Sequence, residues 1–159
     1  MFSWDEIEKI GDLERLRILV DHLPDESLLH MLAKERGRGW DDYPVQAMWN
    51  AVLAGIVFQH QSSNSLIREL SRNAQLRWIC GFRPDSVPTD EAMSRFLKTL
   101  ISHEPEIRIM AKMLLEGIRE YLPDNSFRFE VHTIRGMDKM QLRCSLALLV
   151  MLGMPCVIL

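Results

Sequence analysis

The segment from Val45 to Phe58 constrains the fold more than any other part of this sequence. Only Gln46 and Asn50 within it are polar, so the segment is apolar on every side. Pro44 precedes it and suits the first position of a helix, where its missing N–H costs nothing. A helix that is hydrophobic all round is either buried in a core or spans a membrane. Because a span needs about 20 apolar residues, the sequence predicts a buried central helix.

Amphipathic segments flank this central helix, and their apolar residues recur at helical spacing. Residues that favour the start of a helix precede each of them: Ser3, Asp12, Pro24, Ser62 with Ser63 and Asn64 as alternatives, Asn73, Thr89 and Pro105. Gly81 takes the usual glycine position after a short helix over residues 74–80. The expected fold is therefore all-α, a multi-helix bundle around a buried central helix.

The composition of the chain changes near residue 124. Residues 1–124 are expected to form the helical domain. After Asp124-Asn125-Ser126, residues 127–131 are typical of a short strand and residues 138–152 of a helix. The last part of the chain is almost entirely apolar, so residues 125–159 are expected to pack poorly by themselves.

The charge of the chain is unevenly distributed. The net charge of −3 argues against a generally basic nucleic-acid binder. Residues 1–42 carry 6 basic and 11 acidic side chains, whereas residues 61–102 carry 6 basic and 4 acidic ones. This distribution is compatible with one local anion-binding face in the middle of the chain.

The cysteines and the N-terminus indicate a cytoplasmic protein. The three cysteines are an odd number without CxxC spacing, which favours reduced thiols over a disulfide framework. The first residues show no basic region leading into an apolar one, so no signal peptide is expected. No association with a membrane is expected either.

No catalytic, metal or cofactor site is predicted from the residues. The five histidines are scattered without a pair at ligand spacing on a helix. Asp41 and Asp42 are adjacent, and we interpret them as a solvated turn rather than as ligands of one ion. Neither GxSxG, a P-loop nor GxGxxG occurs, and no cysteine–histidine pairing suggests a nucleophile.

The helices expected over residues 62–72 and 89–102, with a short helix between them, are similar to a helix-turn-helix array. In that motif the second helix enters the major groove and its partner crosses the DNA backbone. The predicted DNA-binding side chains are those on the outer faces of these helices: Arg68, Arg72, Arg77, Ser94, Arg95, Lys98 and Thr99. The alternative is that they are only the solvated faces of amphipathic helices. The long loop before Thr89 and the acidic Asp90 and Glu91, which oppose phosphate, favour that alternative.

A resemblance to a known family rests on three stretches of sequence. They are Tyr43–His60, Ser65–Asn73 continuing to Cys80-Gly-Phe82, and Ser94–Lys98. In this order they resemble the N-terminal domain of bacterial insertion-sequence transposases with a DDE core, over residues 5–123. The resemblance implies binding of double-stranded DNA at the terminal inverted repeats of the element. In the family, a separate ribonuclease-H-like core with three acidic residues and two divalent metal ions, Mg²⁺, cuts and joins the DNA.

The sequence departs from that family after residue 124, where the catalytic core is expected to begin. Residues 131–137 and 139–152 instead resemble the family's extreme C-terminus, so an internal deletion joined near Asn125 is expected. No catalytic carboxylate can be assigned here, and the chain is expected to be a truncated, catalytically inactive transposase without a cofactor. Two alternatives remain: a protein-interaction module that pairs with full-length transposase or with itself and inhibits transposition, or a pseudogene product without a role.

Overall fold

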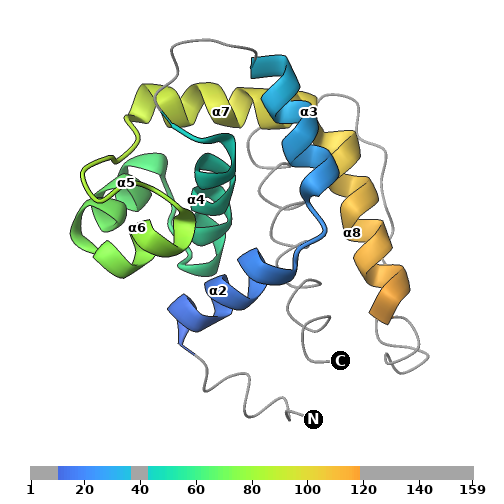
Figure 1. The fold of residues 1–159 in the computed structure, drawn as a ribbon, viewed down its shortest axis with the longest axis horizontal. Helices are drawn as coiled ribbons and strands as arrows, with labels where there is room; N and C mark the ends of the chain where they lie inside the picture. The colour runs from blue at the N-terminus through green and yellow to red at the C-terminus, as the bar shows by residue number, and fades with distance from the viewer. Residues whose placement is uncertain (1–10, 37–42, 119–159) are drawn as a thin grey trace.

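The computed structural model describes residues 11–36 and 43–118. These ranges contain seven helices and no strand, so the predicted all-α fold class is confirmed (Figure 1). The helices are α2 (Asp12–His22), α3 (Glu26–Arg36), α4 (Val45–Val57), α5 (Ser63–Arg72), α6 (Ala74–Cys80), α7 (Asp90–Ser102) and α8 (Glu104–Ile118). The helix expected at Ser3, the boundary at residue 124 and the elements expected after it lie outside the described residues.

Helix α4 forms the centre of the fold, as its apolar sequence predicts. Eight consecutive residues, 47–54, are buried, which covers every side of the helix. It packs most extensively against α6 and also contacts α2, α3 and α5. Figure 1 shows α5 and α6 on one side of α4, with α2 below it and α3 on the other side. Burial on all sides explains why a globular chain tolerates so apolar a segment.

Four helix starts differ from their predicted positions by one or two residues. Pro44 is the N-cap of α4 and not its first residue, and α8 begins at Glu104, one residue before Pro105. Gly11, not Asp12, is the N-cap of α2, and no side chain caps this helix. Helix α3 begins at Glu26 and not at Pro24, because Leu23 is extended and Pro24 follows it outside the helix. A residue before proline favours the extended conformation. The backbone carbonyl of Asp25 then accepts from the N–H of Leu29, which begins the helical hydrogen bonding.

Two buried polar contacts connect α4 to its neighbours. The Nε1–H of Trp49 donates to Oδ2 of Asp25 at 2.6 Å, and the two residues are 0% and 7% exposed. Burial raises the pKa of the Asp25 carboxyl, and the hydrogen bond from Trp49 partly opposes that rise. Toward α6, Nδ2 of Asn50, the residue after Trp49, donates to the carbonyl of Cys80 at 3.2 Å. These contacts fix α3 and α6 against the central helix.

The predicted caps of the middle helices are confirmed. The side chains of Ser62, Asn73 and Thr89 accept from backbone N–H groups three residues ahead, at 3.1–3.2 Å. Each bond satisfies one of the N–H groups that a helix start leaves unpaired. Gly81 ends α6 with a φ of 88°, a left-handed conformation that glycine adopts without a steric penalty. These boundaries were therefore encoded locally in the sequence.

Helix α8 has one apolar face in the core and a second apolar stripe on the surface. Ile107, Met110 and Leu114 are buried, whereas Ile109 and Met113 are 60% and 58% exposed. The exposed pair is four residues apart and therefore shares one side of the helix. None of the helices in the described ranges is long and apolar enough to cross a membrane.

Candidate nucleic-acid interface

Positive charge is concentrated on helices α5 and α6 and the residues beside them. Residues 61–84 carry four arginines and a single glutamate, a net charge of +3. Residues 43–60 carry no charged side chain. Residues 12–36 carry four basic and six acidic side chains, and residues 90–118 carry four basic and five acidic ones. The described residues therefore have one region that attracts a polyanion.

Arg68 and Arg72 lie on the outer face of α5. Both are exposed, whereas Leu66 and Leu70 of the same helix are buried. Since the two arginines are four residues apart, they share one side of the helix. Within the described part of the chain, neither guanidinium forms an ion pair with a carboxylate. Their charge is therefore available to an anion.

Arg77 is half-buried and contacts the end of α5. Its Nη1 donates to the carbonyls of Leu70 and Ser71 at 2.7 and 2.8 Å. The last carbonyls of a helix lack partners within the helix, and a basic side chain can satisfy them. Arg77 thus holds the C-terminal end of α5 against α6. Its predicted contact with a phosphate remains a prediction.

The four predicted residues of α7 lie on two parts of its surface. Lys98 is exposed and Ser94 is half-buried one turn before it. Arg95 and Thr99 line a hollow of about 250 Å³ between α7, the end of α3 and the start of α4. Glu35 and Arg36 of α3 line the same hollow. The structure therefore brings Arg95 and Thr99 together beside α3, and not beside the arginines of α5.

Helices α5 and α7 are held together at their N-terminal ends. Oγ of Ser63 donates to Oδ1 of Asp90 at 2.6 Å, and the two helices pack against each other. The nine residues between α6 and α7 are longer than the turn of three or four residues in a compact helix-turn-helix motif. The hydroxyl of Tyr43 fixes this loop by donating to the carbonyl of Val87 at 3.0 Å. These two hydrogen bonds thus hold α5, α7 and the loop before α7 in place.

Comparison with known proteins adds one match. A family model described as Transposase domain (DUF772) matches residues 4–99, which is more than half of the chain. The chain belongs to this family. No curated protein and no solved structure matches it significantly. The family match confirms the resemblance to an N-terminal transposase domain, and in the described ranges it includes α2 to α6 and most of α7.

The described part of this transposase domain does not provide the ligand set that the family's divalent metals require. No three histidine, cysteine, aspartate or glutamate side chains come together there to form a metal site. Two-metal chemistry needs carboxylates that hold ions about 3.5–4 Å apart. The described residues therefore do not supply such a set of carboxylates.

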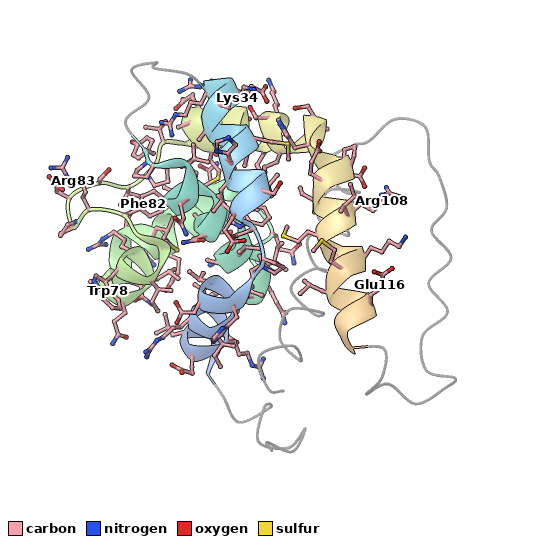
Figure 2. The ribbon with its side chains drawn as sticks, turned by 45° about the vertical axis from the view of Figure 1, so that its right-hand side comes forward. Lys34, Trp78, Phe82, Arg83, Arg108 and Glu116 are labelled. Carbon is pink, nitrogen blue, oxygen red and sulfur yellow. The ribbon has the colours of Figure 1, made fainter. Side chains whose placement is uncertain are left out.

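Two surface residues of the transposase domain were missed in the predicted set. Trp78 is 77% exposed on α6, and Arg83 is exposed in the loop after it (Figure 2). The sequence contained a signal for Trp78. Leu76 and Cys80 are four residues apart and form the buried side of α6, so a residue halfway between them must point outward.

Proposed function

We propose that this transposase domain binds double-stranded DNA at the terminal inverted repeats of an insertion sequence. The observation that carries the proposal is the positive charge of residues 61–84 in a chain whose net charge is negative. Neutralising phosphates with basic side chains releases counterions, which supplies much of the affinity of DNA-binding proteins. We place this activity in the cytoplasm, together with the element's DNA.

The proposed contacts divide between α5 and α7. Arg68 and Arg72 bind phosphates, because both guanidiniums are exposed and neither pairs with a carboxylate of the described residues. Ser94 and Lys98 of α7 reach base edges or the opposite strand, since α7 packs against α5. Phosphate contacts fix the register of a protein on DNA, whereas base contacts give it sequence specificity.

We propose further that the chain binds these ends without cutting them. The support is the sequence after residue 124, which resembles the family's C-terminus and not its catalytic core. Incubation of the purified chain with Mg²⁺ and a plasmid that carries both element ends tests this. We expect the plasmid to stay supercoiled, and nicked or linear product would refute the proposal.

DNA binding is tested by fluorescence anisotropy. A labelled duplex with the terminal repeat is titrated with protein at several salt concentrations, beside a scrambled duplex. We expect at least tenfold tighter binding to the repeat, which corresponds to about 1.4 kcal/mol. The double variant Arg68→Ala/Arg72→Ala should weaken binding and reduce the slope of log K against log salt by about 1.8, or 0.9 for each lost phosphate contact.

A charge-matched control separates local contacts from a change in net charge. Arg17→Ala/Lys112→Ala removes the same two charges from exposed positions on α2 and α8. Affinity and salt slope should stay near wild type in this control. Equal losses in both double variants would show that only net charge matters, and equal weak binding to both duplexes would refute recognition of the repeat.

A second candidate function rests on the exposed stripe of α8. Ile109 and Met113 expose apolar side chains on one side of this helix, as a surface for another protein does. We propose as the alternative that the chain pairs with full-length transposase and inhibits transposition. Size-exclusion chromatography with full-length transposase tests this, and Ile109→Asp/Met113→Asp should abolish co-elution. Separate elution of the wild-type chain would reject the alternative.

A further inference from the structure

Trp78 is the most exposed large apolar side chain of the described residues. It is 77% exposed, whereas Trp49, the other tryptophan in these ranges, is 0% exposed. The indole ring of tryptophan has the largest apolar area of any side chain, and its burial lowers the free energy of a folded domain or of a complex. Trp78 packs little against its own domain, so its ring has most of its contact area left for a ligand.

The charge around Trp78 selects an anionic ligand. Arg72 is exposed just before α6, and Arg83 is exposed just after the turn at Gly81. Figure 2 shows Trp78 and Arg83 at the same edge of the molecule, formed by α6 and the loop after it. Residues 68–85 carry four arginines and two acidic residues. Of the acidic residues, Glu69 accepts a hydrogen bond from the side chain of Asn73 at 3.3 Å, and Asp85 is exposed two residues after Arg83. An anionic ligand therefore meets arginines here.

Helix α6 is also held in place at both ends. Oδ1 of Asn73 caps its start, and Gly81 ends it in the left-handed conformation. Asn50 of the central helix donates to the carbonyl of Cys80 at 3.2 Å. The backbone under Trp78 is thus fixed before any ligand arrives, which lowers the entropy cost of binding on this face.

We propose that Trp78 stacks on an unpaired base of a DNA strand while Arg72 and Arg83 contact the flanking phosphates. A flat π-face between cations is the combination with which proteins bind single-stranded nucleic acid. Bases inside a duplex have both faces covered by their neighbours, so Trp78 distinguishes frayed or tailed DNA from paired DNA. This inference rests on the proposed DNA-binding function and adds a preference for DNA with unpaired bases.

The test compares two labelled DNAs that share one duplex. One is the blunt terminal-repeat duplex, and the other carries an additional single-stranded tail of six nucleotides. We expect wild-type protein to bind the tailed DNA at least fivefold more tightly, since stacking of a base on an aromatic ring gives about 5- to 140-fold in affinity. Trp78→Ala should remove this preference and leave the affinity for the blunt duplex unchanged, and Trp78→Phe should keep most of it.

Two controls make the result specific. Ile109→Ala truncates another exposed apolar side chain, on α8, and should keep the full preference for the tail. Tryptophan fluorescence gives an independent readout, because stacking on a base should quench Trp78. The tailed DNA should quench the wild type more than the Trp78→Phe variant. Far-UV circular dichroism verifies that each variant is folded.

The outcomes separate this inference from the proposed function. Equal affinity of the wild type for tailed and blunt DNA, or an unchanged preference in Trp78→Ala, overturns the stacking site and leaves duplex binding standing. Absence of binding to either DNA refutes the proposed function and the inference with it. If Trp78→Ala instead dissociates an oligomer of the chain and leaves both DNA affinities unchanged, Trp78 is a protein contact and the inference is wrong.

Discussion

Replacing Trp49 by Phe tests whether the buried contact between α4 and the residues before α3 stabilises the fold. Phe keeps an aromatic ring in the core but removes the Nε1–H donor from the buried carboxylate of Asp25. A hydrogen bond to a charged group contributes about 1.5–3 kcal/mol, and the void beside the smaller ring costs about 1 kcal/mol. The free energy of unfolding should therefore fall by about 2.5–4 kcal/mol at pH 7.

Urea denaturation of the full chain, followed by circular dichroism, measures this change. Trp78→Phe is the matched control, because the same substitution is made at a side chain that is 77% exposed. It should change the stability by less than about 0.5 kcal/mol. In an Asp25→Asn background the lost bond is neutral and contributes about 0.5–1.5 kcal/mol. The cost of Trp49→Phe should therefore be smaller there by about 1 kcal/mol or more.

Two results would refute this reasoning. Trp49→Phe could cost less than about 1 kcal/mol, which is below the contribution expected of the charged hydrogen bond alone. It could also cost the same with aspartate and with asparagine at position 25, which would mean that the two side chains are not coupled. Either result would show that the hydrogen bond does not stabilise this contact by the expected amount.

Further predictions follow from burial and backbone geometry. Because burial raises the pKa of Asp25, the folded state holds this proton more tightly than the unfolded state does. The stabilisation that protonation of Asp25 gives to the folded state is complete below the unfolded pKa of about 3.9. It is lost as pH rises through the raised pKa of the folded state. Urea titrations across this window should show a smaller decline for Asp25→Asn than for the wild type. Leu53→Ala should cost about 2–5 kcal/mol in the same assay, since Leu53 is 0% exposed in the core. Gly81→Ala should lower the free energy of unfolding by about 1 kcal/mol, because alanine is strained at a φ of 88°. Gly11→Ala should be nearly neutral, because Gly11 has a φ of −66° and open space around the added Cβ. Burial raises the pKa of the Cys80 thiol to about 12, so in a variant with the other two cysteines replaced by serine, DTNB at pH 8 should react only on unfolding.

The features that the sequence predicted correctly depend on local chemistry. The apolar run of α4 can be satisfied only by burial on all sides. The caps at Ser62, Asn73 and Thr89 are bonds between a side chain and a backbone N–H three residues away. Each of these features depends only on residues that are close together in the sequence, and the structure confirms each prediction. The start of α3 was predicted wrongly at Pro24, since the helix begins two residues later at Glu26.

The candidate site was harder to predict because it depends on packing between distant segments. Arg77 has the same charge as its neighbours on α5, yet its guanidinium caps that helix from α6. Arg95 and Glu35 line the same hollow, although sixty residues separate them in the chain. No local pattern indicates either arrangement. Trp78 is the exception, since its outward direction follows from the spacing of Leu76 and Cys80.

Because α4 is buried on all sides, only some deletions and rearrangements of the gene can still give a folded domain. Helices α2, α3, α5 and α6 each cover part of α4, so removal of any one of them would expose apolar surface of the central helix. The acidic N-terminal helices therefore cannot be lost to leave a smaller and more basic fragment. A rearranged copy of the gene yields a stable protein only if its breakpoints lie outside the codons for residues 12–80. The junction expected near residue 125 satisfies this condition.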